Sequence, residues 1–366
     1  METMIANLQS TIVFVVVLSI LILVHEWGHF ITAKKLGVSV ERFALGFGPT
    51  VYSRMYNGTR YMINLIPLGG YVKMAGDERS ECKGSPEEFY SKPIGQRAWV
   101  IVNGPVVNFI FAYFCLFLVF MAGYPDLSNK VGEILEGYPA QQAGLQVGDK
   151  IVRIDSKPVE NWTDLQGAVT ASSQDRILVE VLRQNQKLDV SIVPRTERIK
   201  NIFGKYKETR LIGIRPAEEI VSLKYGPVVS LVKAFQELVK ITTMTYKAIF
   251  SIVTGSMSAK ENVAGPIGMF FIIKTALQMG MSHLLFVLGV ISASLAIFNL
   301  LPIIPLDGGH LFLLGIEKIR GRALSPKTDE YVVKIGVSLM ICMALFVFYS
   351  DFSRFGWIEK IKQLFP

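Results

Sequence analysis

Apolar and polar residues are strongly segregated along the chain. Long uncharged apolar stretches recur near residues 8–24, 98–122, 284–306 and 335–349. Each is long enough, or nearly so, to cross a hydrocarbon core of about 30 Å as a helix. Residues 125–220 instead alternate short apolar runs with turns. The pattern predicts a polytopic α-helical membrane protein with four transmembrane helices and one inserted domain.

The expected spans can be bounded from the same pattern. They run from about Ile5 to Ile31, Ala98 to Ala122, His283 to Ile304 and Tyr331 to Phe348. The expected domains are 1–123 with the first two spans, 124–222 as the insert, 223–281 as a surface helix and linker, and 282–366 with the last two spans.

The insert reads as a small α+β domain. About 90 residues are enough to hold a core of their own. We expect a helix over Asn161–Ala171 and strands over Val131–Leu135, Lys150–Ile154, Ile177–Leu182 and Leu188–Val193.

Residues 226–254 are apolar enough to suggest a fifth span. However, their charged residues fall on one narrow helical face at about 100° per residue. These residues are Lys233, Glu237, Lys240 and Lys247. Such amphipathicity favours a helix lying in the membrane interface.

The loop after the first span has an unusual apolar character. It contains Gly46-Phe47-Gly48-Pro49, and residues 60–74 read as two short apolar strands around a Pro/Gly turn. This pattern predicts a β-hairpin. Its apolar surface beside a span suggests that it re-enters the membrane, where irregular backbone is tolerated only against protein or a cavity.

Charge orients the predicted spans. The chain has a formal net charge of +8, and its bases cluster beside the spans rather than in a stripe with aromatics, which argues against nucleic acid as a partner. Because residues 32–97 are rich in Lys and Arg, they should face the cytoplasm, with both termini and the insert outside. The three cysteines form no disulfide framework or CxxC pair.

The first span carries the most distinctive chemistry, His25-Glu26-Trp27-Gly28-His29. Histidines four residues apart lie on one helix face and can bind one zinc ion, with the intervening glutamate as general base. The chain has four histidines in all, so chance is a weak explanation. Ionisable groups inside a membrane are usually functional.

A catalytic zinc needs a third protein ligand. The candidates are His283, His310 and an acidic residue, and Asp307 is the best of them. It follows two prolines that must distort the third span. The first and third spans would run in the same direction, which brings Asp307 near the depth of His25 only if residues 226–254 do not cross. An ordinary helix cap is the alternative role for Asp307.

The chemistry favours peptide hydrolysis, with Glu26 taking a proton from water. Asn108 and Asn299 could donate hydrogen bonds to the substrate backbone or oxyanion, or could instead join helices within the membrane. An inactive scaffold with structural zinc and an ion transporter remain alternative functions.

The sequence closely resembles the site-2 protease family, in particular its branch of bacterial regulators of sigma-E proteases. The matching motifs are HEWGHF (25–30), RFALGFGP (42–49), NLIPLGGYVKMAGDE (64–78), NGPVVNFIFA (103–112), GPIG (265–268) and NLLPIIPLDGGHL (299–311). The resemblance implies that His25, His29 and Asp307 bind Zn²⁺ and that Glu26 is the catalytic base. It also implies that residues 61–74 are a re-entrant β-loop that presents substrate.

Further expectations follow from this resemblance. The residues expected to contact substrate are Asn64, Pro67, Gly69, Gly70, Tyr71, Asn108 and Asn299. Residues 139–151 look like part of a PDZ domain, which would contact substrate ends outside the membrane. One such segment is found where the proteobacterial archetype has two. The family cleaves single-span membrane proteins, such as anti-sigma factors or remnant signal peptides, in the bacterial inner membrane after another protease has shortened them.

Overall fold

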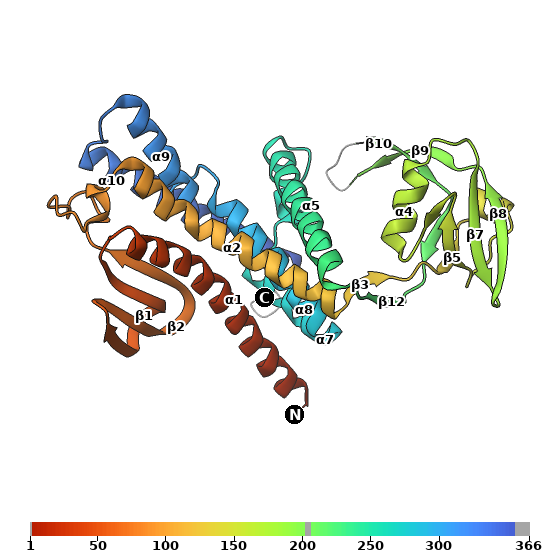
Figure 1. Cartoon of the computed structure of the whole chain (residues 1–366), viewed down its shortest axis with the longest axis horizontal. Helices are drawn as coiled ribbons and strands as arrows, with labels where there is room; N and C mark the ends of the chain where they lie inside the picture. Colours follow the sequence, from red (N-terminus) through yellow and green to blue (C-terminus); the bar gives the residue numbers. More distant parts are fainter. Residues whose placement is uncertain (1, 202–205, 356–366) are drawn as a thin grey trace, which may run out of the picture. The chain divides into compact units, whose positions relative to one another are not determined.

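The computed structural model describes residues 2–201 and 206–355, which fold as two units. The first unit comprises Met1–Leu118, Leu231–Lys247 and Ser258–Pro366. The second comprises Val119–Ser230 and Ala248–Met257. Figure 1 shows that the first is mainly helical, whereas the second is rich in strands.

Four helices of the described chain are long and apolar enough to span a membrane, as the sequence predicts. Their bounds are Glu2–Lys35 for α1, Ile94–Ala122 for α2, Met281–Asn299 for α8 and Pro326–Arg354 for α10. They bear few charges except near their ends, so their side chains suit a hydrocarbon environment.

The expected third span is too long at its carboxyl end. Helix α8 stops at Asn299, not Ile304, and residues 300–306 form turns that include the cis peptide bond between Ile304 and Pro305. Pro302 and Pro305 cannot donate backbone hydrogen bonds, which accounts for the early end.

The expected loop after the third span is instead a helix, α9, from Asp307 to Arg320. Acidic Asp307 lies in its first turn, Lys318 and Arg320 lie in its last, and Gly321 follows with a φ of 66°. Each feature suits that helix end. Lys318, Arg320 and Gly321 are therefore signals of the end of this helix.

The loop after α1 folds into two long paired strands, β1 (Val40–Tyr56) and β2 (Thr59–Met74). The predicted hairpin within residues 60–74 is wrong in its pairing. Leu45 of β1 is paired with both Ile63 and Gly70, so residues 42–45 lie between the two arms of β2. The Pro/Gly segment thus separates two arms that do not pair with each other, and the tight turn lies at residues 57–58.

Helix α5 (Pro227–Val253) contains residues of both units. It is not among the helices that are long and apolar enough to span a membrane. It is followed by α6 (Ala259–Asn262) and by α7 (Pro266–Met279), a helix in the region expected to be a linker. The buried carboxylate of Asp351 on α10 accepts hydrogen bonds from the backbone of Gly265, Ile267 and Gly268, which caps α7.

The second unit contains the strands and helix predicted for the insert, with further strands after them. Its elements are β3 (Tyr124–Leu127), β4 (Val131–Ile134), α3 (Pro139–Gln142), β5 (Lys150–Ile154), β6 (Lys157–Pro158), α4 (Trp162–Ala171), β7 (Ile177–Arg183), β8 (Gln186–Ile192), β9 (Arg195–Lys200), β10 (Tyr206–Leu211), β11 (Ile214–Pro216) and β12 (Ile220–Leu223). The largest sheet has the order β6-β5-β7-β8, and alternate side chains such as Ile151, Ile177 and Val179 form a buried core with α4.

Candidate metal centre

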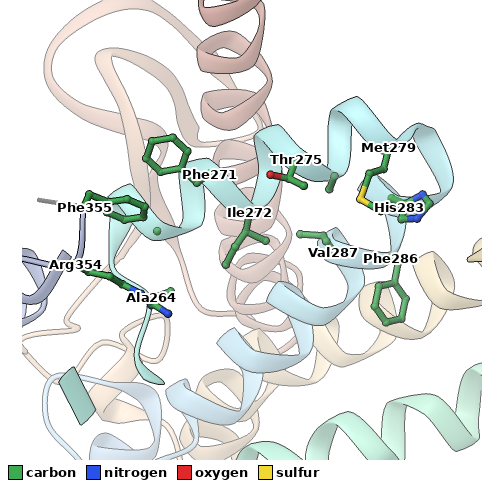
Figure 2. Close-up of a pocket in the computed structure, with 12 residues that line it drawn as sticks. Ala264, Phe271, Ile272, Thr275, Met279, His283, Phe286, Val287, Arg354 and Phe355 are labelled. Carbon is green, nitrogen blue, oxygen red and sulfur yellow. The ribbon is translucent and has the colours of Figure 1, made fainter. Parts of the chain in front are cut away.

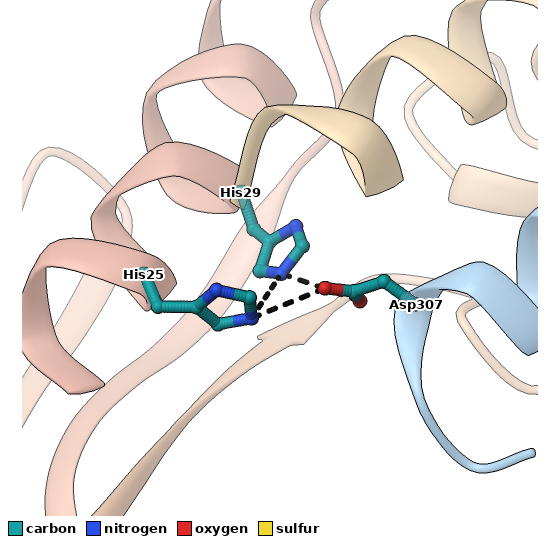
Figure 3. Close-up of side chains that lie close together, drawn as sticks. All are labelled: His25, His29 and Asp307. Atoms are coloured by element: carbon teal, nitrogen blue, oxygen red, sulfur yellow. Dashed lines mark hydrogen bonds and ion pairs between the residues drawn. The ribbon is translucent and has the colours of Figure 1, made fainter. Parts of the chain in front are cut away.

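Three side chains from two distant segments meet in the first unit. Helix α1 places His25 and His29 on one face, and Asp307 is the first residue of α9. Figure 3 shows the two imidazole rings and the carboxylate pointing toward one another. His25 Nε2 lies 3.2 Å from His29 Nε2 and 3.1 Å from Asp307 Oδ2, while His29 Nε2 lies 3.5 Å from Asp307 Oδ1.

These distances suit a zinc ion. Zinc binds histidine nitrogen and carboxylate oxygen at about 2.0–2.2 Å with tetrahedral angles, so neighbouring ligand atoms should lie roughly 3.3 Å apart. The three observed separations bracket that value. Three ligands of this kind leave the fourth position of a tetrahedral zinc for water or substrate.

The carboxylate of Asp307 has properties expected of a metal ligand. Its Oδ2 atom is buried and accepts no conventional hydrogen bond from the described residues. Burial favours the neutral acid, but the neighbouring His25 and His29 rings outweigh it and lower the pKa of Asp307. An ionised carboxylate that faces two imidazole nitrogens is best satisfied by a cation.

A cavity of about 330 Å³ opens beside these three residues. Glu26, Tyr71 and Asn299, all predicted to act on substrate, line it with the three candidate ligands. Apolar side chains supply much of the remaining wall, among them Val72, Val100, Ile101, Leu306 and Met340. A largely apolar cavity with a few convergent polar groups is typical of a binding site.

Glu26 lies between the candidate ligands and strand β2. Its carboxylate lies close enough to the backbone amide of Val72 for the two groups to interact electrostatically. At Gly70 an added Cβ would lie 3.4 Å from Glu26 Cγ. The sheet therefore approaches the His-Glu-His motif through its backbone.

Helix α2 contacts the other side of both histidines. His29 Nδ1 lies 2.9 Å from the carbonyl oxygen of Val100, and His25 Nδ1 lies 3.4 Å from Asn108 Nδ2. Asn108 is fully buried and was expected to contact substrate, but its side chain is placed against His25.

A glycine makes this close approach possible. A Cβ at Gly104 would collide with the His29 ring and lie 2.9 Å from Cε1 of His25. The sequence analysis did not assign a role to Gly104. Its position next to Pro105, near the start of an apolar span, was the available signal.

Three other predicted substrate residues lie within the sheet rather than around the cavity. Asn64 is buried and donates to the Gly46 carbonyl oxygen. The Pro67 carbonyl accepts a hydrogen bond from Ser19 of α1, and Gly69 has a φ of 113° beside the ring of Phe47. Their visible contacts shape the β-loop.

The alternative third ligands lie outside this cluster. His283 lines a larger apolar cavity, of about 520 Å³, formed by α7, α8 and the end of α10 (Figure 2). His310 lies one turn after Asp307, and burial lowers its pKa. Among the described residues, His25, His29 and Asp307 form the cluster of histidine and carboxylate suited to zinc.

A second buried polar cluster, also missed by the sequence analysis, lies in the same unit. Glu317 of α9 forms ion pairs with Arg79 and Arg97, the latter with an Nη2–Oε1 distance of 2.5 Å. Burial alone would raise the pKa of Glu317, but the two guanidinium groups lower it. Both arginines also stack on Tyr90. The cluster joins α9 to α2 and to the loop after β2.

Comparison with known proteins adds independent information. Residues 13–343 match the model of peptidase family M50. A Campylobacter jejuni protein, named as a candidate zinc metalloprotease, is 33% identical over 93% of this chain and 92% of its own length. The regulator of sigma-E protease RseP of Escherichia coli is 30% identical over 93% of this chain and 98% of its own.

A third relative, from Rhizobium meliloti, is also named as a candidate zinc metalloprotease and is 30% identical over 96% of this chain. Its alignment covers 370 positions, whereas the alignment with the Escherichia coli protein covers 447. Since this chain has 366 residues, the Escherichia coli protein contains segments that have no counterpart here.

Proposed function

The chain belongs to peptidase family M50, the site-2 protease family, and is a zinc metalloprotease, and on that premise we propose that His25, His29 and Asp307 bind the zinc and that Glu26 is the general base. The convergence of three ligand atoms at separations of 3.1–3.5 Å carries this assignment. Nothing else among the described residues combines two histidines and a carboxylate so closely.

Zinc, when bound, supplies Lewis acidity toward the attacking water and the scissile carbonyl. Glu26 takes the proton from the water as its oxygen attacks the carbonyl carbon. The same carboxylate then delivers that proton to the amide nitrogen as the carbon–nitrogen bond breaks. The products are a new carboxyl terminus and a new amino terminus. The nearby Val72 amide would help to orient the Glu26 carboxylate for both transfers.

Substrate would bind in an extended form along residues 70–73. These residues pair with β1, and Gly70 and the Val72 amide lie close to Glu26. An added strand alongside these residues would pass the base. A helical substrate must first unwind, because its carbonyl groups are bonded within the helix. Asn299, on the cavity wall, could donate to the scissile carbonyl or to the backbone.

The protein is a multi-pass membrane protein, and we place it in the bacterial inner membrane. The basic residues of 32–97 support a cytoplasmic location for that segment, with both termini and the inserted PDZ-like domain outside. In that position the PDZ-like domain could contact the ends of substrates before they reach the site.

The proposed substrates are single-span membrane proteins already shortened by another protease, either anti-sigma factors or remnant signal peptides. The relationship to the regulator of sigma-E protease supports this class. The shorter insert supports a simpler size filter than two tandem PDZ domains would give.

Glu26→Gln tests the mechanism. The purified variant should cleave a single-span reporter about 10²–10⁴-fold more slowly than wild type, because a general base is lost. It should retain one zinc per chain. Glu41→Gln, at an exposed position on β1, is the matched control and should keep full activity.

Unchanged turnover by Glu26→Gln would exclude the proposed base. His29→Ala and Asp307→Ala separate the metal from the chemistry, because each should lose zinc as well as activity. Retention of stoichiometric zinc in both variants would show that the metal binds elsewhere.

A further inference from the structure

Helix α2 contacts the Nδ1 atom of both candidate ligand histidines, on the side of each ring away from the candidate metal centre. For His29 the contact fixes the tautomer. Its Nδ1 lies 2.9 Å from the Val100 carbonyl oxygen, which can only accept a hydrogen bond. Nδ1 must therefore carry a proton, which leaves the Nε2 lone pair directed at His25 and Asp307. His29 is thus prepared to bind metal through Nε2.

His25 has a different partner, the side-chain amide of Asn108 at 3.4 Å from Nδ1. An amide has one end that donates and one that accepts. If the NH₂ end faces the ring, Nδ1 must accept, Nε2 carries the proton, and metal binding through Nε2 is blocked. If the oxygen faces the ring, Nδ1 donates and Nε2 is free.

The candidate metal centre requires the second orientation, because His25 Nε2 faces His29 Nε2 at 3.2 Å and Asp307 Oδ2 at 3.1 Å and must be unprotonated to bind zinc there. With the NH₂ end toward His25, the Oδ1 atom is fully buried and has no hydrogen-bond partner in the described structure. An orphaned buried oxygen costs about 1–3 kcal/mol. Turning the amide by 180° exchanges two ends of nearly equal size and gives Oδ1 the Nδ1–H of His25 as donor.

Resting on the proposed zinc site, we propose that Asn108 is a positioning residue that accepts a hydrogen bond from His25 and so holds that histidine in its zinc-binding tautomer. Its backbone is fixed in turn, because Ser292 Oγ of α8 donates to the Asn108 carbonyl oxygen at 2.8 Å. Helix α2 then orients both ligands, one through a main-chain carbonyl and one through a side-chain oxygen.

This role differs from substrate binding in a testable way. A residue that stabilises an oxyanion must donate, whereas one that orients His25 must accept. Asn108 is fully buried and does not line the cavity beside Glu26. An ionised aspartate can only accept. The two roles therefore predict opposite results for Asn108→Asp.

The experiment measures zinc affinity of the full-length protein in detergent by competition with a chromogenic chelator. Asn108→Leu keeps the number and branching of the side-chain heavy atoms but removes the acceptor, and should weaken zinc binding about 10–100-fold. Asn108→Asp should bind zinc as tightly as wild type or more tightly. In Asn108→Leu, cleavage measured at saturating zinc should recover relative to cleavage at limiting zinc, whereas Asn108→Asp should show no greater zinc dependence than wild type.

Asn103→Leu is the matched control. Asn103 lies on the same helix but bonds the Gly28 carbonyl and the Thr32 hydroxyl rather than a histidine. Its zinc affinity should match wild type. The absorption spectrum of the cobalt-substituted protein gives a second readout, and only Asn108→Leu should change it.

Wild-type zinc affinity in Asn108→Leu, with cleavage lost, would overturn the proposal in favour of substrate binding. A greater than tenfold loss of affinity in Asn108→Asp would also overturn it, and this variant decides the matter if the leucine variant fails to fold. Absence of zinc from the wild-type protein is a separate result, because it would refute the metal centre itself.

Discussion

The two units of this protein differ in the share of polar side chains among the residues that they bury. In the second unit, the interior is apolar: Ile151, Ile177 and Val179 are fully buried around the four-stranded sheet. In the first, several of the most buried side chains are polar, including Asn108, Ser292 and Arg97. Only 6% of the apolar window of α10 is buried, and its leucines and isoleucines lie on the surface.

The difference shows how a bilayer changes what holds a fold together. Hydrophobic burial drives folding in water, but lipid tails are as apolar as leucine. Helices in a membrane are then joined by close packing, hydrogen bonds and ion pairs. The metal centre lies in the unit that buries more polar side chains among the described residues, and its ligands are contacted by Val100 and Asn108. Four substitutions would test this contrast.

The largest expected effect is at Glu317. Glu317→Leu would leave buried Arg97 without its carboxylate and half-buried Arg79 with Asp329 alone, and should reduce the stability of the first unit by about 3–5 kcal/mol. Thermal unfolding in detergent would measure it. The control is Glu81→Leu, which removes an exposed partner of Lys73 and should cost less than about 1 kcal/mol. Equal midpoints for the two variants would contradict a stabilising polar interior.

Ile151→Ala should destabilise the second unit by roughly 2–5 kcal/mol, because it leaves a cavity in a close-packed core. Hydrogen exchange should quicken in β5 and β7 but remain unchanged in α1 and α8. Val147→Ala, at a position 66% exposed, should leave both regions as they are. Faster exchange throughout α1 would mean that the two units do not unfold separately.

In the second unit, half-buried Arg183 forms an ion pair with the buried carboxylate of Asp149, and a change of pH tests this pair. Burial raises the pKa of Asp149, but hydrogen bonds from Arg183 and the Gln146 amide lower it further, so the folded-state value lies below that of the unfolded chain. The stabilisation, about 2 kcal/mol, is therefore present above about pH 4 and disappears as the pH falls through the folded-state pKa.

Unfolding of this unit, followed between pH 7 and pH 3, should show a loss of stability at the acid end. Arg183→Gln should flatten the profile, because Asp149 then keeps a pKa closer to its ordinary value. If stability fell equally at low pH in the wild-type protein and in Arg183→Gln, the pH dependence would come from other carboxylates.

The smallest effect is expected on the outer surface of α10. Leu339 is 58% exposed, and Leu339→Ala should change stability in lipid by less than about 0.5 kcal/mol. Leu116→Ala is the matched variant at a fully buried position and should cost more, because packing between helices is lost. If Leu339→Ala were the more damaging change, the surface of α10 would be a protein contact.

The sequence was most informative where one local pattern determines the result. The spans follow from runs of apolar residues, and strands such as β5 and β7 follow from alternation. His25 and His29 share a helix face by spacing alone, and Asp307 was chosen by combining topology with the prolines before it. The structure brings these three side chains together. Their roles as ligands remain proposals.

The features that the sequence did not predict share a physical cause, because each depends on contacts between distant segments. Residues 60–74 contain no signal that β1 will lie between their two arms, because register depends on long-range contacts. Helix α9 was not predicted, because it depends on Gly308 and Gly309 packing against the backbone of residues 300–304, a contact that no local pattern signals. The Glu317 cluster combines residues more than 200 positions apart.

Gly104 has one more consequence. The room for both imidazole rings exists because α2 has no side chain at that point, and Gly28 of α1 is equally close to the backbone of α2. A single methyl group at position 104 would push α1 away from α2 and displace the two imidazole rings relative to Asp307. Gly104→Ala removes no chemical group from the site, yet it should abolish cleavage because it displaces the two histidines.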